Sequence, residues 1–256
     1  MPLYNSKLRN KKDIITTNDG TKTMYSYEFD ECYHSTKDGA LQESLNKHIV
    51  PAFNLSSKKD KLRVLDICFG LGFNTLATIY YYRKYSPNTK LHIISPEIDK
   101  NLVKSLKDFD YPKEFSSLKD IISSISNNFY YEDNNLKIEI LIGDAREQIK
   151  KIKEPIDIIY QDAFSPKKNP ALWSVEWFSD IKAIALKNAI LTTYSVATPV
   201  RLSLKEAGFR VYNLESKKVR SATIASLKPL LLNEVDLELK LKRNPNAKAI
   251  WDKDIL

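Results

Sequence analysis

The spacing of hydrophobic and polar positions changes near residue 61. Beyond it, short apolar runs alternate with stretches in which apolar residues recur at helical spacing, which is typical of parallel strands joined by helices. The apolar runs predict strands at residues 63–68, 91–95, 138–142, 156–160 and 189–194. The stretches between them predict helices at 74–85, 101–106, 145–151 and 175–186. We therefore expect an α/β fold whose sheet carries helices on both faces.

The first 60 residues are polar and rich in turns. Asn18-Asp19-Gly20 lies between two short segments that we expect to pair as a hairpin, and a helical pattern follows at 39–52. We interpret residues 1–60 as a lead-in that forms a lid. Residues 61–227 are then the main domain, and residues 228–256 are a C-terminal extension without an assigned function.

Two regions depart from simple alternation of strands and helices. Residues 107–137 are rich in serine, asparagine and aromatic residues and predict an inserted helix and a loop. Residues 209–214 and 220–226 predict strands joined too closely for a helical crossover, so we expect them to be antiparallel. Five parallel strands ending in such a pair resemble the seven-stranded, Rossmann-like sheet of class I S-adenosylmethionine-dependent methyltransferases.

Composition narrows the range of partners and compartments. Of the 256 residues, 40 are Lys or Arg and 32 are Asp or Glu, so the net charge of +8 favours a polyanionic partner. Cys32 and Cys68 lack metal-ligand spacing and the three histidines, His34, His48 and His92, are scattered, which predicts a reduced, metal-free cytoplasmic protein. No apolar run approaches about 18 residues and no signal peptide is recognisable, so we expect no membrane association.

The first predicted strand runs into a glycine loop, VLDICFGLGFNTL. Gly70 and Gly72 permit positive φ angles and a close approach of a ligand to the backbone, and a helix is expected from about Asn74. The third glycine of a dinucleotide fingerprint is missing, so the two glycines could also be simple turn residues. No Lys-Ser or Lys-Thr pair follows the loop, which argues against a nucleoside triphosphate.

Two acidic residues follow the next strands. Glu97, in SPEIDK, is placed to accept hydrogen bonds from two ribose hydroxyls. Asp144, in GDAR, could accept a hydrogen bond from the exocyclic amine of an adenine, and the small Ala145 would leave room for the adenine ring. Asp144 is also a fair N-cap for the helix that begins at Ala145. Because these acids end successive strands, together they predict a site for a nucleoside cofactor.

A third acid follows the strand at 156–160, in the segment QDAFSPKKNPALW. Asp162 lies just past the end of this strand, and Pro166 and Pro170 prevent an immediate helix. Ligands of open α/β sheets bind outside the carboxyl ends of the strands, where one Asp can meet both cofactor and substrate. The alternative is a turn-forming Asp before a helix.

With these motifs in place, the chain resembles the methyltransferase part of the MnmC-like tRNA-modifying enzymes over roughly residues 20–226. The matching segments are YEFDECYHSTKDGALQES, FGLGFNTL, SPE, GDA, DAFSPKKNPALW and KEAGFRV. The family motif Asp-Gly-Phe-Ala-Pro-x-Lys-Asn-Pro-x-x-Trp is matched through Asn169, Pro170 and Trp173. The chain departs from the family at Cys68 and Phe73, and SKKVRS replaces the basic Gly-Arg-Lys-Arg segment.

The resemblance implies methylation, with S-adenosyl-L-methionine as donor, of the 5-aminomethyl group of (2-thio)uridine at the tRNA wobble position. The product would be 5-methylaminomethyl-(2-thio)uridine. Asp162 is the expected catalytic residue. The expected cofactor-binding residues are Gly70, Gly72, Asn74, Glu97, Asp144, Ala145 and Glu43, the last as acceptor for the methionine ammonium. The expected substrate-binding residues are Phe164, Pro166, Lys167, Lys168, Tyr33, Lys218 and Arg220.

The same resemblance implies a partner RNA and a preceding enzyme. The partner would be the anticodon stem-loop of tRNA, with the lysines, Lys217 included, and Arg220 near its phosphates. Such basic runs are also common as solvated faces, and Phe164 and Pro166 could serve ordinary loop packing. Because the sequence ends before a flavin-binding oxidase could follow, we expect a stand-alone methyltransferase whose aminomethyl-uridine is supplied by a separate enzyme.

Two alternative functions stay open at this point. The first is a methyltransferase for small polyamine-like amines, although the net charge and the Lys167-Lys168 pair disfavour a polycationic substrate. The second is an RNA-binding module without catalysis. That alternative is disfavoured by the intact Gly70, Glu97 and Asp162, because a degenerate site would be expected to lose at least one such residue.

Overall fold

The computed structural model describes residues 6–56 and 59–255. Its strands are β1 Lys12–Thr16, β2 Lys22–Ser26, β3 Glu31–Cys32, β4 Lys61–Ile67, β5 Lys90–Glu97, β6 Tyr130–Glu132, β7 Leu136–Ile142, β8 Ile156–Gln161, β9 Ala185–Thr193, β10 Arg210–Leu214 and β11 Ala222–Ser226. Its α-helices are α1 Ala40–Glu43, α2 Val50–Leu55, α3 Phe73–Tyr85, α4 Lys100–Ser105, α5 Lys119–Asn128, α6 Ala145–Gln148, α7 Val175–Ile184, α8 Thr198–Glu206 and α9 Leu237–Arg243.

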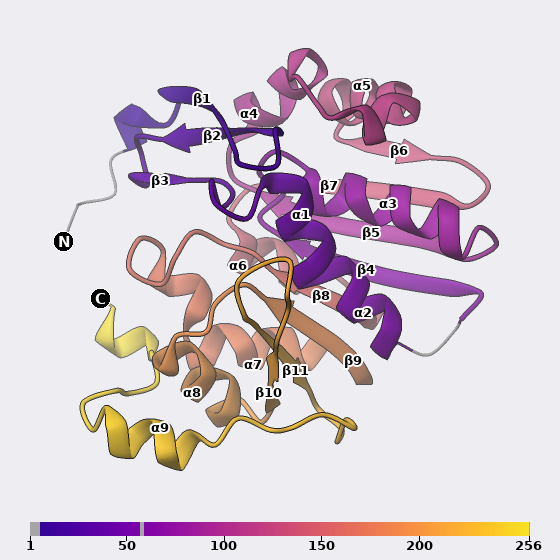
Figure 1. The fold of residues 1–256 in the computed structure, drawn as a ribbon. Helices are drawn as coiled ribbons and strands as arrows, with labels where there is room; N and C mark the ends of the chain where they lie inside the picture. The colour runs from indigo at the N-terminus through magenta and orange to yellow at the C-terminus, as the bar shows by residue number, and fades with distance from the viewer. Residues whose placement is uncertain (1–5, 57–58, 256) are drawn as a thin grey trace.

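The central sheet of these described residues has eight strands, in the order β10-β11-β9-β8-β4-β5-β7-β6 (Figure 1). The five inner strands from β9 to β7 run parallel, and β10 and β11 form the expected antiparallel pair. The prediction of a mostly parallel α/β sheet with an antiparallel C-terminal pair is therefore confirmed.

The predicted count of seven strands is wrong, because β6 adds an antiparallel edge strand to β7. β6 lies in the region expected to be a helix and a loop. The chain reverses after α5 at Phe129, which has a φ of 59°. It reverses again at Asp133, whose Oδ1 accepts hydrogen bonds from the backbone N–H groups of Asn135 and Leu136. Two tight turns around three residues thus produce a strand from a sequence typical of loops.

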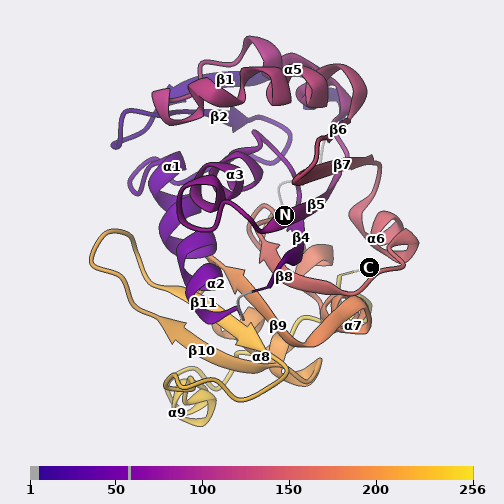
Figure 2. The ribbon, with the colours of Figure 1, turned by 90° about the vertical axis from the view of Figure 1, so that its right-hand side faces the viewer.

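Strand residues alternate between two hydrophobic layers. In β4, Val64 belongs to the cluster under α3, whereas Leu65 belongs to the cluster under α7. Ile158 and Ile159 of β8 divide in the same way. Figure 2 shows α1 to α3 on one side of the sheet and α6 and α7 on the other. This two-sided burial explains why the strands are apolar throughout.

The N-terminal segment forms a second, three-stranded antiparallel sheet in the described residues, in the order β1-β2-β3. The predicted hairpin is confirmed by the pairing of β1 with β2. The helical pattern at 39–52 is also confirmed, but its middle is a π-helix, Ser44–Ile49, between α1 and α2. This helical run packs on α3.

The C-terminal segment folds back along the main domain. α9 packs against α8, and the chain then forms a 3₁₀ turn, Asp252–Asp254. Arg146 at the start of α6 donates to both carboxylate oxygens of Asp252, at 2.9 and 2.5 Å. No helix in the two described ranges is long and apolar enough to cross a membrane.

Candidate active site

A cavity of about 750 Å³ opens at the carboxyl ends of β4, β5, β7 and β8. The N-terminal segment covers it, and Ile255 of the C-terminal segment reaches its wall. Of the residues predicted from sequence, the cavity is lined by Gly70, Asn74, Glu97, Asp144, Ala145, Glu43, Asp162, Phe164, Lys168, Tyr33 and Arg220. Gly72, Pro166, Lys167 and Lys218 do not line it.

The glycine loop needs both of its glycines. Gly70 has a φ of 54° and Gly72 a φ of 74°, in the left-handed region that L-residues rarely adopt. A Cβ on Gly72 would lie 2.8 Å from Cζ of Phe69, and one on Gly70 would lie 3.1 Å from Cδ1 of Tyr33. Gly72 is therefore a turn residue at the start of α3, whereas Gly70 exposes backbone to the cavity.

Glu97 is fixed by backbone groups. Its Oε2 accepts from the N–H of Gly70 at 2.8 Å, and its Oε1 accepts from the N–H of Asp99 at 2.7 Å. Burial raises the pKa of Glu97, although these backbone hydrogen bonds act against the rise. Each carboxylate oxygen has further lone pairs. Glu97 can therefore still accept the predicted hydrogen bonds from ribose hydroxyls.

Asp144 is the N-cap of α6, as the alternative interpretation held. Its Oδ1 accepts from the backbone N–H of Arg146 at 2.8 Å. The same residue is exposed and lines the cavity next to the buried Ala145. Capping uses one lone pair of one oxygen, so it leaves acceptors that could face an adenine amine.

Asp162 is held from two sides by side chains. Asn74 Nδ2 donates to its Oδ2 at 2.7 Å. His48 Nε2 lies 3.6 Å from its Oδ1, which is an ion-pair distance rather than a hydrogen bond. Burial acts to raise the pKa of Asp162, but the attraction of His48 and the hydrogen bond from Asn74 outweigh it and lower the pKa. The amide of Asn74 is thus engaged by Asp162, and its predicted contact with the cofactor stays a prediction.

A second carboxyl group, Asp66, lies beneath this contact and is 1% exposed. Thr75 Oγ1 donates to its Oδ2 at 2.7 Å, and Asn74 Nδ2 lies 3.4 Å from its Oδ1. Burial, aided by the negative charge of Asp162, raises the pKa of Asp66 to about 7. Asp162 therefore carries the more permanent negative charge of the two.

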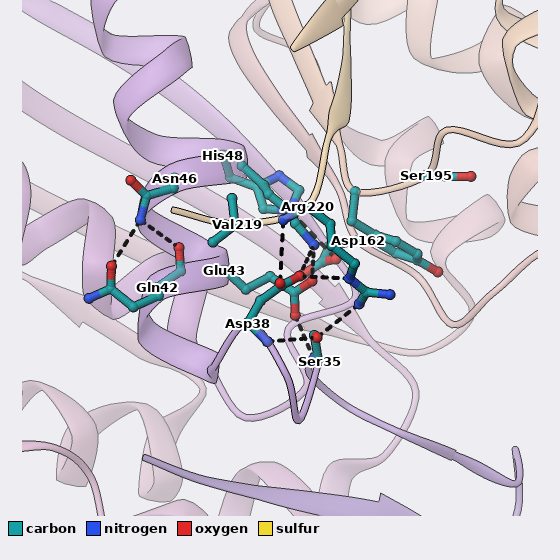
Figure 3. Close-up of polar contacts among 12 residues, drawn as sticks. Ser35, Asp38, Gln42, Glu43, Asn46, His48, Asp162, Ser195, Val219 and Arg220 are labelled. Carbon is teal, nitrogen blue, oxygen red and sulfur yellow. Dashed lines mark hydrogen bonds and ion pairs between the residues drawn. The ribbon is translucent and has the colours of Figure 1, made fainter. Parts of the chain in front are cut away.

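Glu43 belongs to an ionic cluster that joins the N-terminal segment to the loop before β11 (Figure 3). The buried Lys47 donates to Glu43 Oε1 and to Asp38 Oδ2, both at 2.7 Å. Glu43 Oε2 also accepts from the N–H of Ser35 at 2.6 Å. Arg220 donates to Asp38 Oδ2 at 3.1 Å. Because Lys47 already neutralises the charge of Glu43, a cofactor ammonium that binds Glu43 would have to share its carboxylate with Lys47.

An aromatic wall closes one side of the cavity. Phe164 stacks on Phe29 with ring centroids 4.3 Å apart, and Tyr33 meets it edge-on at 4.9 Å. Trp173 is fully buried, and its indole N–H donates to the carbonyl oxygen of Phe164 at 2.8 Å. The Trp of the sequence motif thus supports the wall from behind.

The predicted phosphate ligands fall into two groups. Lys168 and Arg220 line the cavity but are ion-paired, Lys168 with Asp30 at 2.8 Å and Arg220 with Asp38 at 3.1 Å. Lys167 and Lys218 are exposed outside the cavity. The two paired residues would have to exchange a carboxylate partner for a phosphate.

The sequence interpretation missed His48 and Asp66 as parts of the site. Asp66 carried a usable signal, since an acid inside an apolar strand is costly unless it has a specific role. His48 carried a weaker one, because a histidine on the helix at 39–52 is as easily a core residue. In the described residues, no group of three His, Cys, Asp or Glu side chains is arranged to hold a metal ion.

Comparisons with known proteins add independent information. Residues 113–229 match a family model described as S-adenosyl-L-methionine-dependent methyltransferase. The chain is 32% identical to an uncharacterized protein of Methanocaldococcus jannaschii, over 92% of this chain and 70% of that protein. It is 30% identical, over 74% of its length, to the tRNA 5-methylaminomethyl-2-thiouridine biosynthesis bifunctional protein MnmC of Leptospira interrogans, of which it spans 31%.

The fold has a matching solved structure. The chain aligns with the crystal structure of MnmC2 from Aquifex aeolicus at a TM-score of 0.85 and 30% identity, covering 98% of this chain and 82% of that one.

Proposed function

We propose that this chain, which belongs to the MnmC-like family of S-adenosyl-L-methionine-dependent methyltransferases, methylates the 5-aminomethyl group of (2-thio)uridine at the wobble position of tRNA. Its methyl donor is S-adenosyl-L-methionine. The observation that carries the proposed substrate is the carboxylate of Asp162, which Asn74 and His48 approach from two sides in the cavity that the cofactor-side residues also line.

The cofactor-side residues fit the proposed donor. Glu97 would accept the ribose hydroxyls, Asp144 and Ala145 would face the adenine, and the backbone of Gly70 would lie along the ligand. When bound, the donor supplies an electrophilic methyl group on a sulfonium. These residues hold and orient it, and the cavity walls limit the access of water.

Asp162 addresses the chemical problem of the acceptor. A primary ammonium has a pKa of about 10 and no lone pair, so it must lose a proton before it can attack a methyl group. The carboxylate attracts the cation, and then accepts a hydrogen bond from the neutral amine, which aims the lone pair. The ammonium proton leaves to water, because a carboxylate of lowered pKa is a weak base. The new N–C bond forms as the methyl–sulfur bond breaks, and its electron pair stays on sulfur.

The aromatic wall suits the base that carries this amine. A wobble uridine must leave the anticodon stack, at a cost of a few kcal/mol, and Phe164 with Tyr33 offers a surface on which it can stack. Exposed Lys167 and Lys218 would contact phosphates of the anticodon stem-loop, together with Lys168 and Arg220 after exchange of partners. A separate enzyme would supply the aminomethyl-uridine, and the cytoplasm, where tRNA is abundant, is the proposed compartment.

The test is methyl transfer from labelled S-adenosyl-L-methionine to tRNA purified from cells that lack this protein. The wild type should place label in 5-methylaminomethyl-uridine, identified by mass spectrometry, and Asp162→Ala should not. Asp60→Ala is the matched control, because Asp60 is exposed and immediately precedes β4 at its amino end.

Two results would argue against the proposed substrate. If tRNA gains no label although the protein binds the donor, a small-molecule amine becomes the better substrate class. If the rate stays flat as salt is raised from low to moderate concentration, the phosphate contacts are wrong, since such contacts weaken steeply with salt.

A further inference from the structure

His48 is buried beside the proposed catalytic carboxylate without lining the cavity. Its side chain is 0% exposed, and its ring packs edge-on against Tyr160 with centroids 5.6 Å apart. Nδ1 lies 2.9 Å from Oγ1 of Thr192 on β9. Three elements far apart in the sequence therefore fix the ring: the π-helix that carries it, β8 and β9.

The second nitrogen of this ring has an unusual environment. Among the described residues, His48 Nε2 is buried without a hydrogen-bond partner. The nearest acid is Asp162, whose Oδ1 lies 3.6 Å away. A buried N–H without a partner costs about 1–3 kcal/mol, so the ring would gain from a small movement that brings the two groups to hydrogen-bond distance. Contacts of this kind are often long before substrate binds.

The contact with Thr192 bears on where the ring proton lies. If the hydroxyl of Thr192 donates to Nδ1, a neutral ring carries its proton on Nε2. If the ring is protonated, both nitrogens carry a proton and Nδ1–H donates to Thr192. In both cases Nε2–H faces Asp162. Asn74 donates to the other oxygen of this carboxylate at 2.7 Å. The two donors would then hold both oxygens and leave the remaining lone pairs facing the cavity.

The π-helix explains how a histidine reaches this position. The backbone hydrogen bonds of a π turn span one residue more than those of an α turn, and such turns are often found at functional sites. Within Ser44–Ile49, Lys47, His48 and Ile49 are consecutive and all buried. Lys47 forms ion pairs with Glu43 and Asp38. His48 faces Asp162 instead (Figure 3). Two adjacent residues of the π turn thus make different contacts, Lys47 with the ionic cluster and His48 with Asp162.

From these contacts we propose that His48 is a positioning residue for methyl transfer: its Nε2–H holds Oδ1 of Asp162, so that the carboxylate presents a fixed face to the substrate amine. This inference rests on the proposed function. His48 touches neither substrate nor donor and acts through Asp162. Its loss should therefore lower kcat, and leave the affinity for S-adenosyl-L-methionine and the KM for tRNA nearly unchanged.

Two isosteric amide variants test the contact. In His48→Gln the side-chain amide can reach the place of Nε2, and in His48→Asn it can reach only the place of Nδ1. We expect His48→Asn to lower kcat about 100-fold, the order of loss for a misplaced catalytic group, and His48→Gln to stay within about fivefold of the wild type. Donor affinity by calorimetry should change less than about twofold in both.

The pair separates positioning from structural support. A residue that merely filled the core would give similar losses in both variants, with parallel losses of thermal stability, and that result would overturn the inference. His92→Gln is the matched control, because His92 is also largely buried but bonds to Glu139 at the other end of β5. It should leave kcat unchanged.

A second measurement needs no substrate. In protein labelled with ¹⁵N-histidine, His48 should show the proton on Nε2, and Asp162→Asn should shift the His48 signals without moving those of His92. A proton on Nδ1 alone would rule out donation to Asp162 whatever the variants do. If the wild type fails to methylate tRNA while this NMR result holds, the proposed substrate is wrong and the His48–Asp162 contact stands.

Discussion

The two halves of the cavity each hold a carboxylate, buried in Glu97 and half-buried in Asp162, and they hold it by different means. Glu97 accepts hydrogen bonds from the backbone of Gly70 and Asp99. Asp162 depends on the side chains of Asn74 and His48, the first of them 88 residues away. Backbone donors are present whatever the side chain is, whereas side-chain donors must be specified one by one.

The pKa values of the two carboxyl groups are also shifted in opposite directions. Burial raises the pKa of Glu97, although the hydrogen bonds from the backbone of Asp99 and Gly70 oppose the rise. The pKa of Asp162 is lowered against its burial by His48 and Asn74, so it stays anionic for a cationic amine. The cofactor half therefore depends on backbone shape, and the substrate half depends on a maintained charge.

The largest expected effect comes from changing each carboxylate to its amide. Asp162→Asn should lower kcat about 10²- to 10³-fold, since it removes the charge that attracts and orients the amine, and should leave donor affinity nearly unchanged. Glu97→Gln should weaken donor binding about tenfold, as one acceptor becomes a donor that faces a backbone N–H. Calorimetry and steady-state rates at saturating donor measure the two effects separately. Equal losses of donor affinity in the two variants would contradict the assignment of Glu97 to the donor and Asp162 to the substrate.

The second prediction concerns the glycine loop of the cofactor half, where a single added methyl group should lower the unfolding free energy. Gly72→Ala places a Cβ at a φ of 74° and 2.8 Å from Phe69, and should cost roughly 3 kcal/mol of unfolding free energy. Gly20→Ala is the matched control, because its φ is 82° but nothing lies within 4 Å. It should cost about 1 kcal/mol. Urea unfolding gives both values, and equal losses would show that packing against Phe69 is unimportant.

A smaller effect concerns Asp66, which supports the substrate half. In the native protein the pKa of Asp66 is about 7, against an ordinary value of 3.8. The native state therefore binds more protons than the unfolded state between these values, so the unfolding free energy falls as pH rises from about 4 to about 7. Asp66→Asn removes this dependence on pH, so relative to the wild type its unfolding free energy should rise by roughly 3 kcal/mol between pH 5 and pH 8.

Unfolding of both proteins at the two pH values measures this gain. Parallel profiles would mean that Asp66 ionises normally in the native state, and the assignment of the lasting charge to Asp162 would then lose its support.

The sequence predicted residues that line the cavity where the signals are local. Gly70, Glu97, Asp144 and Asp162 follow predicted strands, and parallel strands bring such positions to one edge. His48 could not be found in this way, because its partners Thr192 and Asp162 lie far along the chain and no local pattern connects them. The ion pair between Lys168 and Asp30 was hidden for the same reason.

The fold shows the same division. Five parallel strands and the antiparallel pair were predicted from apolar runs, whereas β6 was missed because it has only three residues between two turns. The π-helical turn at Ser44–Ile49 was missed too. A helix of either kind buries the same apolar residues, so the hydrophobic pattern does not distinguish them.

The separation in sequence between Arg220 and Asp38 bears on the order in which contacts form during folding. This ion pair joins residues 182 positions apart, whereas the contact of Glu97 with Gly70 spans 27. Closing a long loop costs more chain entropy before any contact repays it, so distant contacts tend to form late in folding. The contact that holds Asp162 to Asn74 is also longer in sequence, at 88 residues. During folding, the contact between Glu97 and Gly70 in the donor half should therefore form before the contacts that hold Asp162, and competence to bind should precede competence to react.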